Sequence, residues 1–354
     1  MAILAVWISA ATLMLTADLA GQQASEPVRI VGPHYQTNFL SLATDGGWQY
    51  WDKGYLITWA FSGKTLSVTP DQPAVVLYDS NGGRRDAYVW LEGAERVAVG
   101  SAAVTPSGKL MVAGGTQDAH GVIAHYIAEV GDNDHVSRVV RTTPFIAVSI
   151  CSSRDDRVWA YGFERDENGK SVENAPMLRE YDFEKGQLRA TLYPANLNPG
   201  WSLPNGRYPG EITLRCNSKS VGIYNARSSE WVQFDLSANT LKVVNVDLLP
   251  PTSRLHITGF ALTESGEVFA SFHDRSKGPP VSGIFKLTLD AGGSGRWAQV
   301  EGTVGPYLGG SATARLMGAD GDDLVHTRKL DGKVFWSKYE KASNRQVDAG
   351  GSPK

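Results

Sequence analysis

Polar residues that could take part in acid–base or binding chemistry gather in three segments, each flanked by apolar runs. The segments are Gly114–Gly121, Gly162–Pro176 and Phe272–Ser282. Two carboxylates that converge on one opening can act as general acid and base, and polar loops on a rigid scaffold can equally hold a ligand. The alternative is that these side chains are merely solvated. The candidate binding residues in the three segments are Asp118, His120, Glu164, Arg165, His273 and Asp274.

A fourth candidate segment is the proline-rich stretch Tyr193–Glu211. A long ordered loop that carries an exposed aromatic ring can form a lid or a platform on which a sugar stacks. The alternative is that Trp201 packs over the junction between two structural units. The candidate binding residues in this segment are Trp201, Arg207, Tyr208 and Glu211.

Short motifs of common catalytic and metal centres are missing. The seven histidines form no HExxH spacing, and neither GxSxG nor GxxxxGK[ST] occurs. The stretch Asp320–Asp323 fits a turn better than a calcium loop. The sequence therefore predicts no cofactor, and it leaves the question of catalysis open while favouring a binding protein.

Composition limits the class of protein. The chain has 354 residues, of which 42% are hydrophobic, and its formal net charge is −3. No block of lysine and arginine marks a nucleic-acid or anionic-membrane surface. The 38 glycines, 10 tryptophans and 13 tyrosines favour many short strands and turns.

The N-terminal residues Met1–Ala17 carry no charge and are typical of the apolar part of a secretory signal. No lysine or arginine precedes them, so an uncleaved anchor is the alternative. We expect residues 1–26 to be signal and linker, and the protein to be secreted or periplasmic.

Cys151 and Cys216 are the only cysteines, so a cysteine-based zinc site is excluded. They occupy equivalent places in consecutive repeats. In an exported protein such a pair can form a disulfide. Equivalent positions in adjacent repeats are often too far apart for one, which slightly favours free thiols.

A repeat of about 50 residues runs through the chain. Its clearest copy is Ser101–Gly115, where a Thr-Pro-Ser-Gly turn joins two apolar strands. The third strand of each copy is aligned by six residues whose successive separations are 48, 55, 53, 53 and 52 residues. These residues are Tyr78, Tyr126, Tyr181, Phe234, Leu287 and Tyr339.

A repeat of three to four strands at this period predicts an all-β fold, a β-propeller. Six blades fit best, and seven fit if Phe39–Tyr50 forms a blade of its own. The strand Val28–Val31 could complete the last blade and close the ring, which removes free edge strands. We expect residues 27–342 to form this single domain and residues 343–354 a disordered tail.

The stretches SAAVTPSGKLMVAGG and GFALTESGEVFASF resemble the secreted bacterial β-propellers of the NHL and TolB-like kind. The resemblance implies a fold and a loop-rich funnel face on which ligands bind. The leading hypothesis is a non-catalytic propeller that binds a protein, carbohydrate or small-molecule partner there. A structural propeller in a larger envelope assembly is another possibility.

The second hypothesis is a metal-dependent lactonase-like or glycan-active enzyme. The resemblance to six-bladed lactonases implies a divalent cation, such as calcium, at the channel mouth. Its counterparts here would be Glu211, Asn205 and Asp274, although their flanking residues do not match the lactonase motifs.

Overall fold

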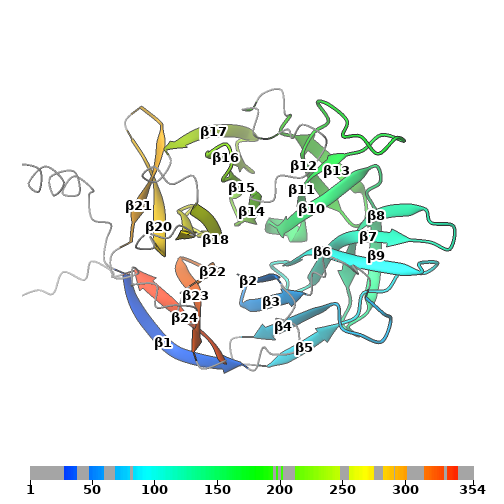
Figure 1. Ribbon diagram of the computed structural model, residues 1–354, viewed down its shortest axis with the longest axis horizontal. Coiled ribbons are helices and arrows are strands. Elements are labelled where there is room, and N and C mark those ends of the chain that lie inside the picture. Colours follow the sequence, from blue (N-terminus) through cyan, green and yellow to red (C-terminus); the bar gives the residue numbers. More distant parts are fainter. Residues whose placement is uncertain are drawn as a thin grey trace, which may run out of the picture.

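The computed structural model describes residues 28–37, 48–59, 68–79, 83–193, 197, 201, 212–247, 255–274, 282–290, 292–300, 315–330 and 333–341. These residues form strands joined by turns, with one short 3-10 turn at Arg154–Asp156. Figure 1 shows the strands arranged as a ring around a central axis. None of the described segments is a helix long and apolar enough to cross a membrane.

The described strands fall into six antiparallel units of four strands, and the fourth and fifth units are joined by a short parallel pairing of β17 with β21. Units one to three are β2 (Trp48–Asp52), β3 (Tyr55–Trp59), β4 (Val75–Asp79), β5 (Arg84–Ala87); β6 (Arg96–Val104), β7 (Leu110–Gln117), β8 (Ile123–Val130), β9 (Val136–Arg141); and β10 (Phe145–Ser152), β11 (Val158–Glu164), β12 (Leu178–Asp182), β13 (Gly186–Thr191).

Units four to six follow the same plan. They are β14 (Ile212–Cys216), β15 (Ser220–Asn225), β16 (Glu230–Asp235), β17 (Thr240–Asp247); β18 (Leu255–Leu262), β19 (Val268–Asp274), β20 (Ser282–Leu289), β21 (Gly295–Gln299); and β22 (Arg315–Asp320), β23 (Asp323–Leu330), β24 (Lys333–Lys341), β1 (Val28–Thr37).

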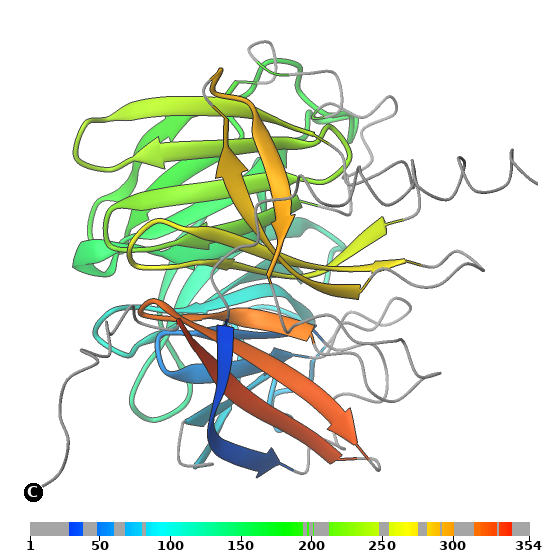
Figure 2. The same ribbon diagram turned by 90° about the vertical axis from the view of Figure 1, so that its left-hand side faces the viewer.

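The β-propeller prediction is confirmed, and so is the register of the third strands. All six aligning residues lie on the third strand of a unit. The N-terminal strand closes the ring as predicted: β1 pairs antiparallel with β24, with Ile30 opposite Tyr339. Figure 2 shows β1 (dark blue) beside the C-terminal strands (orange-red). The segment Phe39–Tyr50 was considered as a possible seventh blade. Its residues 39–47 lie outside the described residues, and Trp48–Tyr50 belong to β2, the innermost strand of unit one.

Each unit buries both of its faces, one against each neighbour. On β7, Val112 packs into the core between units one and two, whereas Met111 and Ala113 pack into the core between units two and three. Successive side chains of a strand point to opposite faces, so burial of both faces requires apolar residues of both parities. This explains the continuous apolar run LMVA, and the remaining junctions have cores of the same kind.

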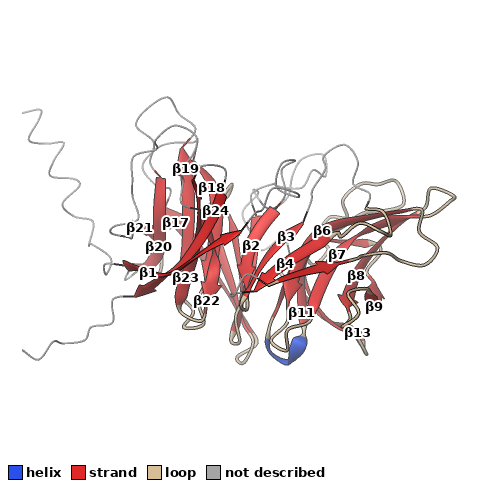
Figure 3. Ribbon diagram, turned by 90° about the horizontal axis from the view of Figure 1, so that it is seen from below, coloured by secondary structure: helices blue, strands red, loops and turns tan. Residues whose placement is uncertain are grey.

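The two faces of the ring differ in their connections. We call the end that carries the turns between first and second strands (52–55, 104–110, 152–158, 216–220, 262–268 and 320–323) the turn face. The opposite end, which carries the β7–β8 and β11–β12 turns, is the loop face. Figure 3 shows the turns of the turn face along the lower edge, with the 3-10 turn in blue.

The recurring Thr-x-Ser-Gly motif forms the same turn in units two and five. The backbone N of Lys109 donates to Thr105 Oγ1 at 3.1 Å, and the backbone N of Gly108 donates to the carbonyl of Thr105 at 2.9 Å. In unit five, Glu267 N donates to Thr263 Oγ1 at 2.9 Å. The threonine thus holds the turn closed, and the glycine adopts the positive φ that the turn requires.

The serine of these turns contacts an acidic residue of the next unit. The backbone N of Ser107 donates to Asp156 Oδ1 at 3.1 Å, and its hydroxyl donates to the other carboxylate oxygen. We call each such contact a turn clasp, because it joins the turns of adjacent units. Two further clasps are Ser218 with Glu264 and Ser265 with Asp322.

Candidate functional site

Asp118 and His120 lie in the β7–β8 turn of the loop face. Asp118 Oδ1 accepts hydrogen bonds from the backbone N of His120 and of Val122, both at 2.9 Å. The carboxylate therefore fixes the shape of the turn. Val122 and Ile123, which follow Gly121, are each 60% exposed, which is more than any other large hydrophobic of the described chain.

Glu164 and Arg165 lie at the end of β11, also on the loop face. Glu164 forms an ion pair with Arg179, whose guanidinium also lies 4.2 Å from the centre of the Phe145 ring. The Arg165 guanidinium lies 5.4 Å from the centre of the Phe163 ring. The Glu164 carboxylate is thus engaged in packing within unit three, which does not favour a role in proton transfer.

The loops of units two and three meet at His125, on β8. Its backbone N donates to Thr143 Oγ1 at 2.7 Å. Burial holds the pKa of His125 below its usual value; a backbone hydrogen bond with Gly114 opposes this, and the charge of Arg165 adds to it. Because burial is the largest of these effects and the net shift is downward, the imidazole form of His125 is favoured at pH 7.

Trp201 is 3% exposed and does not form a platform on the surface. It packs between units three and four, edge-on to Tyr161 with ring centroids 6.0 Å apart. Its Nε1 donates to a carboxylate oxygen of the buried Glu230. This is the packing alternative considered from the sequence.

The remaining predicted residues are described in part or not at all. Arg207, Tyr208 and Glu211, together with Asn205, lie outside the described residues. The backbones of His273 and Asp274 end strand β19, where His273 pairs with His256. Within the described part of the chain, no group of three histidine, cysteine, aspartate or glutamate side chains could hold a metal ion.

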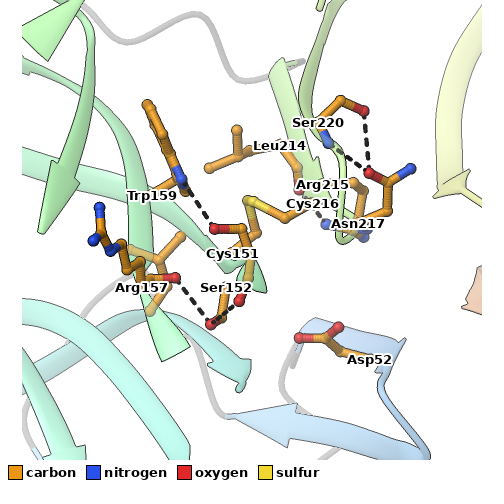
Figure 4. Close-up of a disulfide and its surroundings, with 12 residues drawn as sticks. Asp52, Cys151, Ser152, Arg157, Trp159, Leu214, Arg215, Cys216, Asn217 and Ser220 are labelled. Carbon is orange, nitrogen blue, oxygen red and sulfur yellow. Dashed lines mark hydrogen bonds between the residues drawn. A yellow bond between two sulfur atoms is a disulfide. The ribbon is translucent and has the colours of Figure 1, made fainter. Parts of the chain in front are cut away.

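A cluster of polar groups that the sequence did not single out lies inside the ring. The guanidinium carbon of Arg215, on β14, is 4.6 Å from the centre of the Tyr50 ring, on β2. Asp52, at the end of β2, accepts from Lys53 Nζ and from the backbone N of Val104, both at 2.9 Å. Figure 4 shows Asp52 on its strand and Arg215 beside the disulfide. A single arginine in the short inner strand ITLRC is the sequence signal that could have pointed to this cluster.

The disulfide Cys151–Cys216 links β10 and β14, the inner strands of units three and four (Figure 4). The slight preference for free thiols was wrong. The two Cα atoms are 5.5 Å apart, inside the range that a disulfide spans. Both residues lie near the ends of inner strands that contact each other.

Comparisons with known proteins found no family model and no curated protein that matches the chain. Several solved structures are similar in fold at low identity. A periplasmic gluconolactonase of Pseudomonas aeruginosa, PpgL, is 14% identical with a TM-score of 0.44, covering 88% of this chain and 90% of the other. The WD40 repeats of RRP9 are 8% identical with a TM-score of 0.45, covering 88% and 100%. A Bacteroides caccae protein of unknown function is 14% identical with a TM-score of 0.40, covering 72% and 82%. At these values the likenesses carry no argument about activity.

Proposed function

We propose that the protein is an exported, non-catalytic β-propeller that binds a protein partner through its loop face. The observation that carries the proposal is the exposure of Val122 and Ile123 at the end of a turn fixed by Asp118. Exposed apolar side chains on a preorganised turn are suited to burial against a partner, since little conformational entropy is lost on binding.

Two further features support the proposal. The Asp118 carboxylate holds its own turn and the Glu164 carboxylate pairs with Arg179 on β12, so both residues contribute to a rigid surface. The disulfide is of the kind that persists in oxidising compartments, which supports export. A carbohydrate or small molecule remains the second class of partner, to be bound on the same face.

The proposal is tested first with paired variants at exposed valine or isoleucine positions. Ile123→Asp removes an apolar group from the loop face, and Val139→Asp makes the same kind of change on the outer strand β9. Capture of a specific partner from envelope extracts should fall about tenfold or more for Ile123→Asp and stay unchanged for Val139→Asp. Equal loss in both variants would contradict binding through the loop face.

The proposal that the protein is not an enzyme is tested by assaying turnover of lactones, glycosides and phosphoesters, and by measuring thermal stability with calcium. Purified protein should turn over none of these substrates, and its melting temperature should not change when calcium is added. Turnover together with a melting temperature that rises with calcium concentration would establish instead a metal-dependent enzyme, because an ion that binds only the native state stabilises it.

A further inference from the structure

Arg215 is held across the interior of the ring. It lies on unit four and Tyr50 lies on unit one, and the two units are three apart in either direction around the ring of described strands. The guanidinium nevertheless reaches 4.6 Å from the Tyr50 ring centre. The side chain therefore crosses the axis of the propeller.

The charge of this guanidinium is only partly compensated. Its Nη1 donates to the carbonyl of Leu214 at 2.8 Å, but its buried Nε has no hydrogen-bond partner among the described residues. No ion pair joins Arg215 to Asp52 or to another carboxylate in the described part of the chain. The contact with the face of Tyr50 supplies some attraction, but the half-buried guanidinium has no anionic partner among the described residues.

The ring that the guanidinium contacts carries a second unsatisfied donor. The Tyr50 hydroxyl is buried and has no hydrogen-bond partner among the described residues. Burial, and next the charge of Asp52, raise the pKa of this hydroxyl well above its usual value, with Arg215 opposing, so it keeps its proton at neutral pH. Two donors, one of them charged, thus share one region and lack acceptors.

We propose that Arg215 and Tyr50 bind a small organic carboxylate inside the ring, near the turn face. A guanidinium presents its donors in a planar fork that matches the two oxygens of a carboxylate, and the Tyr50 hydroxyl adds a third donor. Asp52 lies near enough to influence both side chains, and its charge disfavours a dianion such as phosphate. The disulfide at the next residue, Cys216, fixes the strand that presents Arg215. This site does not depend on the loop face.

The test is a thermal-shift titration of the full chain with sodium acetate and sodium glycolate, against sodium chloride at matched ionic strength. The melting temperature of the wild-type protein should rise with the logarithm of ligand concentration above the dissociation constant, by about 2 °C at roughly ten times that constant. Arg215→Gln should weaken binding about tenfold or more, and Tyr50→Phe should weaken it by a smaller factor. Arg154→Gln, an exposed arginine of the turn face, should bind as the wild type does.

A second readout guards against variants that fold poorly. In the wild-type protein, the ¹⁵N resonance of the buried Arg215 Nε should shift on addition of acetate, and Arg215→Lys should identify that signal by its loss. Absence of a rise in melting temperature together with absence of a saturable ¹⁵N shift, an equal response in Arg215→Gln, or tighter binding of inorganic phosphate than of acetate would each overturn the proposal.

Discussion

At the scale of single residues, the most informative contact is the turn clasp between Ser107 and Asp156. Burial alone would raise the pKa of Asp156, but hydrogen bonds from Ser107 and Thr105 and the charge of Lys109 outweigh it and hold this pKa below its usual value. A carboxylate whose pKa is lowered on folding stabilises the native state above the pKa that it has in the unfolded chain. That stabilisation is lost as the pH falls through the pKa of the folded state.

Asp156→Asn should therefore lower the free energy of unfolding at pH 7 by about 0.5–1 kcal/mol, a modest value because the contact is partly exposed. The difference from wild type should shrink towards zero below about pH 4. Urea denaturation at both pH values measures it. The matched control is Asp155→Asn, an exposed neighbour at which no comparable loss is expected. A difference that is unchanged at low pH would contradict an ionised clasp.

At the scale of elements, β-bulges shape the inner strands. The register of β6 against β7 shifts between Val99 and Ser101, and β10 shifts likewise between Ala147 and Ser149. Beside each bulge a carbonyl approaches a glycine of the second strand. A Cβ on Gly114 would lie 1.8 Å from the oxygen of Ala98, and one on Gly162 would lie 1.9 Å from the oxygen of Ile146. These glycines are required by close backbone approach.

Gly114→Ala should consequently lower the free energy of unfolding by about 3 kcal/mol, since the backbone must move to admit the methyl group. Gly115→Ala is the matched control, because its nearest neighbour would be His125 Nδ1 at 3.4 Å, an ordinary contact. Chemical denaturation of both variants measures the contrast. Similar free energies of unfolding for the two variants would show that the backbone at the bulge admits a methyl group at little cost.

The strands were predictable from the sequence and the bulges were not. Large apolar residues, five of them aromatic, recur at one position of each third strand, as Tyr126 and Phe234 do. This pattern is local and can be recognised without knowing which strands pair. A bulge depends on the pairing of two strands, which a local pattern does not encode. The pair Gly114-Gly115 is the one sequence feature that marks the position of a bulge. The contact of Arg215 with Tyr50 joins residues from opposite units, so no local pattern encodes it. The sequence left it undecided whether Trp201 is exposed or packed, because a tryptophan suits both environments.

At the scale of the whole molecule, the ring is held by two kinds of closure. Strand β1 completes the unit that contains β22, β23 and β24, so the first and the last described strands share one sheet. The disulfide joins units three and four and spans 65 residues of sequence. Together they limit opening of the ring between units, which would expose edge strands and the apolar cores between units.

Replacing both cysteines, Cys151→Ala with Cys216→Ala, should lower the free energy of unfolding by about 4 kcal/mol, because the unfolded chain regains the entropy of a long loop. Equilibrium denaturation with and without reductant measures the effect. Reductant should destabilise the wild type and leave the double variant unchanged. Alkylation of two thiols in the unreduced protein would contradict the disulfide.

The loop face is the feature on which the account of function depends, and site-specific photo-crosslinking in the producing cells tests it most directly. A photoreactive amino acid at Ile123 probes the loop face, and the same group at the exposed Pro106 probes the turn face. We predict a discrete crosslinked partner from position 123 and none from position 106. Crosslinking from position 106 alone, or from neither position, would contradict binding through the loop face.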